Sequence, residues 1–381
     1  MTSVGRSEVV LVGGGHAHVH VLDALARRPV PGLRVTLVTR DLATPYSGML
    51  PGVVAGLYRA EQAHVDLGPL CAATGTRMVH GEAVGLDRSA KRILIAGQEP
   101  VPYDVASIDV GIAPSLSSIA GAAEHAIAVK PIGSFLDKLD RLIEGVRRAD
   151  GPRRIAVIGG GAGGVELMLA LRSRLPAELR EAGGDPAAMR FALVTDGEVL
   201  AGHNGRVRAA FRHIFAERII ALHEYRRVAA VTTSAIALQD GEVIAADAVL
   251  VTTDAAAPAW FAGTGLALDP GGFIAVGPSL QSINDPDVFA AGDCAGMVET
   301  PRPKAGVYAV RAGPPLAANL RRRAMGEATE PWRPQRRHLA LISTGERFAV
   351  ASRGIIKMEG AWLWRLKDWI DRRWVDAYRR P

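Results

Sequence analysis

The chain has 381 residues, a formal net charge of +6 and 48% apolar residues. This length exceeds what one hydrophobic core usually supports, so we expect about two domains and an appendage. The composition argues against a disordered or low-complexity protein, and no stretch approaches the roughly 20 apolar residues of a membrane span. No nucleic-acid-binding motif accompanies the positive charge. Because the N-terminus enters a predicted strand within a few residues, we expect no leader segment and a cytoplasmic protein.

A glycine-rich turn near the N-terminus is the first informative segment. Apolar patterning predicts βαβ elements at 8–12, 17–28 and 34–39. A strand that ends in glycines lets the backbone approach a pyrophosphate, and the next helix presents free N–H groups and a positive dipole end to it. His18 stands where such a fingerprint usually has its third glycine, so we expect the helix to pack slightly farther from the strand. The predicted cofactor-binding residues of this turn are Gly13, Gly14, Gly15, His16, Ala17 and His18.

The end of the second strand departs from the usual pattern. Thr39 stands where a carboxylate normally accepts the ribose hydroxyls, so we expect Thr39 or Arg40 to bind the adenosine end. Three histidines follow a His-x-His-x-His pattern, but only His16 and His20 would share a face of the helix, beside the expected pyrophosphate. We therefore predict no metal site there.

The first segment continues with a hairpin-like run at 91–95 and closes with a strand within 103–111. A second fingerprint follows the predicted strand 155–158, and two such matches about a domain apart are far more specific than one. Its predicted nucleotide-binding residues are Gly159, Gly161, Ala162 and Gly164. The matching strand at 190–194 leads into Asp196, whose negative charge would repel a 2′-phosphate, so NADH is favoured over NADPH.

A third motif lies at 285–295, where a turn and a short apolar strand end in Gly292 and Asp293. Together the three motifs resemble the pyridine nucleotide-disulfide oxidoreductase superfamily of flavoproteins. The resemblance implies an α/β protein with two Rossmann-like dinucleotide-binding domains in a glutathione-reductase-like arrangement. It implies FAD at the first fingerprint and the Gly-Asp turn, and NADH or NADPH as co-substrate at the second fingerprint.

The implied domains are discontinuous. We expect residues 1–115 and 272–330 to form the FAD domain, residues 116–271 to form the NAD(P) domain with its linker, and residues 331–381 to form a tail.

Further segments narrow the resemblance to one branch. Residues 31–41, 44–52, 64–67, 129–132 and 301–308 are similar to the oxidoreductase found alone or fused ahead of selenophosphate synthetase. That branch is related to type II NADH dehydrogenases and sulfide:quinone oxidoreductases, which are peripheral membrane flavoenzymes that pass electrons to quinone. Quinone is therefore the first candidate acceptor.

The resemblance also implies site residues. Tyr46 and Pro51 would line the flavin ring, and Lys130 would lie near its polar edge. Glu166 would either approach flavin and nicotinamide or simply complement the helix dipole, and both interpretations remain open. Lys304 would lie near flavin and quinone. Alternatively, it is a surface lysine near the start of a helix. The catalytic candidates are Lys130, Glu166 and Lys304; the other implied cofactor contacts are Val84, Gly111, Ala305, Gly306 and Val307.

Some features of these relatives are missing. The two cysteines, Cys71 and Cys294, are far apart in the sequence, which argues against dithiol relay and against the cysteine chemistry of sulfide oxidation. Type II NADH dehydrogenases have a pair of glutamines at the quinone site. In this chain the two matching positions are occupied by Val307 and Arg311, so the pair is missing.

Four of the six tryptophans lie at 362–374, at helical spacing among arginines and lysines. This pattern predicts a basic amphipathic helix, which could bind a membrane surface, pack on its own core or form a homodimer face. We expect an enzyme that takes hydride from NAD(P)H and reduces an acceptor. A soluble reductase of a small selenium or sulfur compound and a flavin-binding redox sensor remain alternatives.

Overall fold

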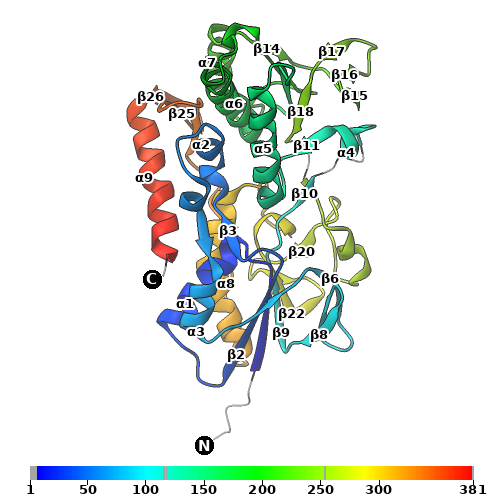
Figure 1. Ribbon diagram of the computed structural model, residues 1–381. Coiled ribbons are helices and arrows are strands. Elements are labelled where there is room, and N and C mark those ends of the chain that lie inside the picture. Colours follow the sequence, from blue (N-terminus) through cyan, green and yellow to red (C-terminus); the bar gives the residue numbers. More distant parts are fainter. Residues whose placement is uncertain (1–6, 115, 117, 253–254, 380–381) are drawn as a thin grey trace, which may run out of the picture.

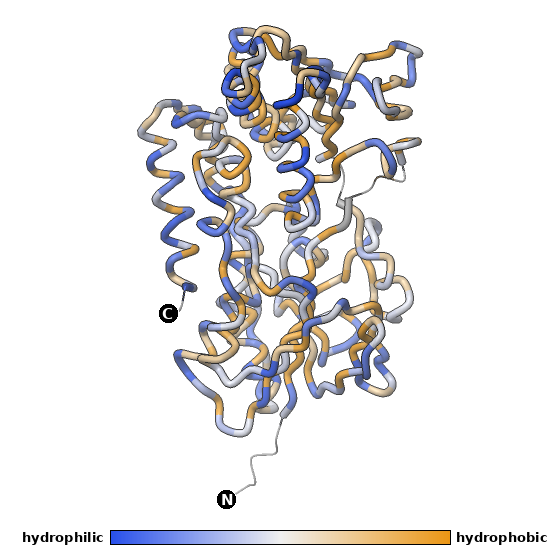
Figure 2. Tube along the Cα trace, in the orientation of Figure 1, coloured by the Kyte–Doolittle hydropathy of each residue, from blue (hydrophilic) through white to orange (hydrophobic). Residues whose placement is uncertain are grey.

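The computed structural model describes residues 7–114, 116, 118–252 and 255–379. Two α/β units are stacked along the long dimension of the molecule, and the C-terminal helix runs beside them (Figure 1). Hydrophobic residues follow the central strands of both units, whereas the outer helices alternate hydrophobic and hydrophilic residues (Figure 2). The expected α/β fold class is confirmed.

The lower unit in Figure 1 is built on an eight-stranded sheet whose strands come from both halves of the chain. β1 pairs in parallel with β2 and β9, and β22 pairs in parallel with β9. Helices α1 (His16–Arg27), α3 (Leu67–Thr74) and α8 (Gly306–Ala324) pack on it. In sheet order the strands are β23 (Ala295–Met297), β20 (Ile274–Val276), β21 (Gln281–Ser282), β22 (Asp285–Ala290), β9 (Val105–Ile108), β1 (Ser7–Val12), β2 (Leu33–Thr39) and β5 (Arg77–His80).

The upper unit contains a parallel five-stranded sheet, with α5 (Ile132–Arg147), α6 (Ala162–Glu181) and α7 (Gly205–Glu217) around it. Its strands, in sheet order, are β11 (Ala126–Ala128), β18 (Ala248–Val251), β12 (Arg154–Ile158), β13 (Arg190–Val194) and β14 (Ile220–His223). A small antiparallel sheet of β15 (Val228–Val231), β16 (Ala235–Leu238) and β17 (Val243–Ala245) lies beside it. Both units thus have the expected Rossmann-like form.

Smaller elements connect these units. The expected hairpin is the antiparallel sheet of β6 (Ala83–Asp87), β7 (Arg92–Ile95) and β8 (Gln98–Pro102). β3 (Ala43–Pro45) pairs with β4 (His64–Asp66), and β10 (Ala113–Pro114) pairs with β19 (Ala255–Ala256). The remaining short helices are α2 (Leu50–Val54), α4 (Ala122–His125), and the 3-10 turns η1 (Ser47–Met49), η2 (Ala60–Ala63), η3 (Pro186–Ala188), η4 (Ala259–Gly263) and η5 (Gly292–Cys294).

The C-terminal segment forms the antiparallel strands β24 (Ala340–Ser343), β25 (Ala349–Arg353) and β26 (Ile356–Gly360), followed by helix α9 (Ala361–Tyr378). One face of α9 is buried through Leu363, Asp371, Val375 and Tyr378. The predicted amphipathic helix is present, and this face packs on the protein's own core. Within the described residues, no helix is long and apolar enough to cross a membrane.

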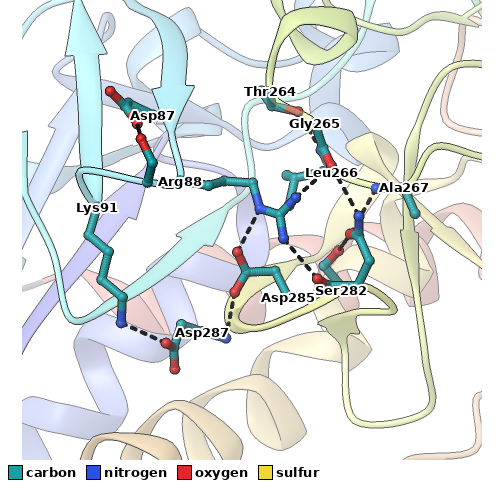
Figure 3. A network of polar contacts seen from close by, with 12 residues as sticks. Asp87, Arg88, Lys91, Thr264, Gly265, Leu266, Ala267, Ser282, Asp285 and Asp287 are labelled. Carbon is teal, nitrogen blue, oxygen red and sulfur yellow. Dashed lines mark hydrogen bonds and ion pairs between the residues drawn. The ribbon is translucent and has the colours of Figure 1, made fainter.

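A polar network joins the β6–β7 turn to the returning segment of the chain (Figure 3). The Arg88 guanidinium donates Nε to Asp285 at 2.8 Å, Nη1 to the Gly265 carbonyl at 2.6 Å and Nη2 to the Asn284 carbonyl at 2.8 Å. Lys91 donates to Asp287 at 2.7 Å. These contacts hold together segments almost 200 residues apart in sequence, which local propensity alone would not position.

We expect Arg88→Ala to lower the free energy of unfolding by about 1–3 kcal/mol, because it removes the guanidinium donor from Asp285 and from the carbonyl groups of Gly265 and Asn284. Urea unfolding followed by circular dichroism measures this change. The matched control is Arg336→Ala, which removes an exposed arginine and should change stability by less than about 0.5 kcal/mol. Equal effects of the two substitutions would contradict the role assigned to the network.

Candidate functional site

A cleft of about 610 Å³ opens at the carboxyl ends of β1, β2 and β9. Parallel α/β sheets place ligands at this edge. The cleft is also lined by the segment before α5, by Trp260 in η4 and by the first turn of α8. Its lining includes these predicted site residues: Gly13, Gly14, Gly15, His16, Thr39, Arg40, Val84, Gly111, Lys130, Asp293 and Gly306.

The first fingerprint has no room for side chains. Gly13 has a φ of +91°, and an added Cβ there would overlap the Asp109 backbone. A Cβ at Gly14 would lie 2.6 Å from Leu67 Cδ1, and one at Gly15 would overlap the Asp109 carboxylate. The turn is therefore a backbone cradle at the start of α1, which fits the pyrophosphate of a dinucleotide.

His18 is fully buried between the glycine turn and β9. Its Nδ1 lies 2.6 Å from the Gly13 carbonyl oxygen and its Nε2 lies 2.8 Å from Ser107 Oγ. Burial lowers the pKa of His18 to about 4, so the ring is neutral near pH 7. The imidazole thus fills the helix–strand contact in place of the usual small residue, and it serves the core rather than the cleft.

Lys130 and Asp293 bring two segments together in the cleft. Lys130 Nζ lies 2.9 Å from Asp293 Oδ2, although the two residues are 163 positions apart. Lys130 precedes α5, and Asp293 lies in η5 after β22. The pair places one positive and one negative charge beside the glycine cradle.

His16 forms the floor of the cleft toward α9. Its ring packs edge-on against Tyr46 at 5.4 Å and Trp374 at 5.1 Å, and Tyr46 stacks on Trp374 at 4.4 Å. Burial lowers the pKa of His16 to about 4. Tyr46 is therefore turned toward α9, and neither Tyr46 nor Pro51 is among the residues that line the cleft.

Glu166 makes its hydrogen bonds away from the cleft. Its Oε1 accepts from Ser343 N at 2.7 Å and from Ser343 Oγ at 2.9 Å, which ties α6 to β24. Burial raises the pKa of Glu166, while the nearby Lys367 ammonium opposes that shift. Lys367 itself donates to the Gly48 carbonyl at 2.6 Å and to Asp371 at 2.7 Å. No pattern in the sequence predicts this buried contact between α6, α9 and η1.

The ammonium group of Lys304 contacts groups of the protein itself. Its Nζ donates to the Ala295 carbonyl at 2.6 Å and lies 3.8 Å from the centre of the Phe273 ring. Burial lowers its pKa. Lys304 and Ala305 line a separate small cavity of about 40 Å³, whereas the neighbouring Gly306 lines the large cleft.

The second fingerprint opens α6. An added Cβ at Gly164 would overlap the Gly159 carbonyl, whereas at Gly161 and Gly163 it would meet nothing within 4 Å. Gly164 therefore allows close packing of helix on strand, and the first turn stays open to a ligand. Asp196 follows β13 with its side chain 68% exposed, 3.9 Å from Arg227.

Neither thiol nor metal chemistry has a site among the described residues. Cys71 and Cys294 are free and buried, and burial raises their thiol pKa values to about 11 and about 12. No group of three or more histidine, cysteine or acidic side chains within the described ranges could hold a metal ion.

The model of the pyridine nucleotide-disulphide oxidoreductase family matches residues 7–313. The chain is 23% identical over 338 residues to the NADH dehydrogenase-like protein YutJ of Bacillus subtilis, covering 86% of this chain and 87% of that protein. It is 22% identical over 347 residues to the type II NADH:quinone oxidoreductase of Staphylococcus aureus, covering 85% of this chain and 84% of the relative.

Solved structures share this fold. The sulfide:quinone oxidoreductase from Aquifex aeolicus gives a TM-score of 0.81 at 18% identity, over 98% of this chain and 91% of that one. The NDH2 from Plasmodium falciparum, in complex with NADH, gives a TM-score of 0.75 at 13% identity, over 99% of both chains.

We expect Gly164→Ala to lower the free energy of unfolding by about 1–3 kcal/mol, because the added methyl group forces α6 away from β12. Gly163→Ala, one residue earlier in the same helix, adds its methyl group in open space and should stabilise the protein by about 0.5–1 kcal/mol. Urea unfolding of the two variants checks the opposite signs. A loss of stability in both would contradict the packing role of Gly164.

Proposed function

The chain belongs to the pyridine nucleotide-disulphide oxidoreductase family, and from this premise we propose that it is an NADH dehydrogenase that passes electrons to a quinone. Its FAD-dependent NAD(P)H oxidoreductase activity follows from the family and its NADH dehydrogenase-like relatives. The observation that carries the proposal is the large cleft in which the glycine cradle of β1 meets the Lys130–Asp293 pair. The open first turn of α6 offers the second nucleotide site.

The residues of the cleft fit FAD. The cradle Gly13–Gly15 offers backbone close approach to a pyrophosphate, and Lys130 supplies a positive charge beside it. Thr39 and Arg40 lie in the lining at the end of β2, where the adenosine ribose would be placed. FAD, when bound, supplies the hydride-accepting and electron-donating chemistry that these side chains lack.

The second site favours NADH. Asp196 lies just beyond β13, and the adjacent Thr195 faces Gly160 of the fingerprint. A carboxylate at this strand end suits the free ribose hydroxyls of NADH and repels the 2′-phosphate of NADPH.

The outer face of α9 supports a membrane-dissolved acceptor. Trp362 and Trp369 are 53% and 56% exposed, and Arg373 lies 5.3 Å over the Trp369 ring. Exposed aromatic and basic side chains on a helix suit an anionic lipid surface. The opposite face of the same helix carries Trp374, which packs on Tyr46 and His16 at the cleft.

We expect the purified protein to be yellow. Its flavin absorbance near 450 nm should bleach when NADH is added without oxygen, and it should bleach more slowly with the same concentration of NADPH. Addition of a short-chain ubiquinone or menaquinone should then reoxidise the flavin and restore the absorbance. A flavin that never bleaches would contradict hydride transfer and favour the sensor interpretation. A flavin reoxidised by selenium or sulfur compounds but by no quinone would support the soluble reductase.

We expect the double substitution Trp362→Ser and Trp369→Ser to reduce binding to anionic liposomes about tenfold, because it removes the interfacial aromatic groups. The matched control is Val243→Ser with Met325→Ser, which removes exposed apolar side chains elsewhere on the surface. Flotation of the wild type and both variants provides the measurement. Equal flotation of all three proteins would remove the argument that α9 delivers electrons to a membrane quinone.

A further inference from the structure

We propose that Asp109 is a proton-carrying residue of the FAD site, which must be protonated when the pyrophosphate binds, so that binding of FAD takes up a proton. The inference rests on the proposed function, because it assumes that FAD occupies the large cleft. The usual strand-to-helix cradle offers free N–H groups to a phosphate, and here a carboxyl group already accepts hydrogen bonds from two N–H groups of the first helical turn.

The position of the carboxyl group is defined by its hydrogen bonds. Asp109 directly follows β9, lines the cleft and is 2% exposed. Its Oδ2 accepts from Ala17 N at 2.9 Å and from His18 N at 3.2 Å. Asp109 therefore holds first-turn N–H groups of α1, the kind of donor with which a helix N-terminus binds an anion.

The same carboxyl group fills the space between two glycines from distant segments. An added Cβ at Gly15 would overlap the carboxylate, and an added Cβ at Gly292 would overlap Oδ1. Gly15 belongs to the first fingerprint and Gly292 to the Gly-Asp turn, the two motifs assigned to FAD. Asp109 thus lies where the two halves of the FAD site meet, and the missing side chains of both glycines leave room for its carboxyl group.

Among the described residues, no lysine or arginine side chain forms an ion pair with the Asp109 carboxyl group. The nearby charge is Asp293, whose Oδ2 lies 2.9 Å from Lys130 Nζ. Burial, and secondarily repulsion by Asp293, raise the pKa of Asp109 to about 7, against the stabilising effect of the two N–H bonds. The negative pyrophosphate of FAD would favour the neutral form further, because a like charge disfavours ionisation.

Three buried groups near Asp109, namely His16, His18 and Cys294, do not change charge near neutral pH. His16 and His18 of α1 have pKa values of about 4, because both rings are buried. The Cys294 thiol of η5 has a pKa of about 12 for the same reason. Proton uptake on FAD binding between about pH 7 and 9 is therefore assigned to Asp109.

The sign of the effect follows directly. A carboxyl pKa raised by bound FAD means that the complex holds a proton that the free protein loses as the pH rises above about 7. The affinity for FAD should therefore fall with rising pH, by up to about tenfold per pH unit, until the pKa of the complex is passed. An uncharged isostere at this position removes the dependence.

The test uses the full-length protein freed of flavin and titrated with FAD, with flavin fluorescence as readout, at pH values from about 6 to 9. The dissociation constant of the wild type for FAD should rise with pH above about 7. The dissociation constant of Asp109→Asn should stay the same across this pH range. Calorimetry in two buffers of different ionisation enthalpy should give uptake of up to one proton per FAD by the wild type and none by the variant. Asp41→Asn removes an exposed carboxylate from the same cleft and should keep the pH dependence.

The outcomes separate the two proposals. FAD binding with no proton uptake by the wild type, or with the same pH slope in Asp109→Asn, overturns this inference and leaves the proposed function in place. Absence of FAD binding at every pH overturns the proposed function and this inference with it. If Asp109→Asn does not fold, the proton uptake of the wild type alone decides.

Discussion

The candidate site depends on the tight contact between the end of β9 and the start of α1. Asp109 accepts hydrogen bonds from Ala17 N and His18 N, and the His18 ring spans from the Gly13 carbonyl to Ser107. Two buried polar side chains thus fix a helix N-terminus against the ends of two parallel strands. Because Gly15 and Gly292 leave room for the Asp109 carboxyl group, the same contact joins segments from both halves of the chain around one cleft.

The C-terminal helix belongs to this site as well as to the surface. Its inner face carries Trp374 onto Tyr46 and His16, while Lys367 bonds the Gly48 carbonyl in the loop beside the cleft. Its outer face exposes Trp362 and Trp369. The helix is therefore joined to a residue that lines the cleft, His16, by direct side-chain packing.

Backbone motifs were more predictable than side-chain roles. The glycine turns, their strands and the Gly-Asp turn lie where the sequence predicted them, because each depends on short-range patterning and on glycine's lack of a Cβ. Glu166 and Lys304 instead bond Ser343 and Ala295, partners that sequence spacing does not identify. Asp109 was missed because an isolated aspartate after a strand has no distinctive pattern.

The sequence by itself determined the strand–glycine–helix units and the amphipathic C-terminal helix, since these follow from local pattern and residue type. Only the tertiary structure decided which charges meet. Lys130 reaches Asp293 across 163 positions, and the β22 strand pairs with β9 across an even greater separation, with Val288 opposite Ala106. Such pairings depend on how the sheet closes around the inserted unit, and the direction of each buried side chain depends on packing against residues distant in the chain.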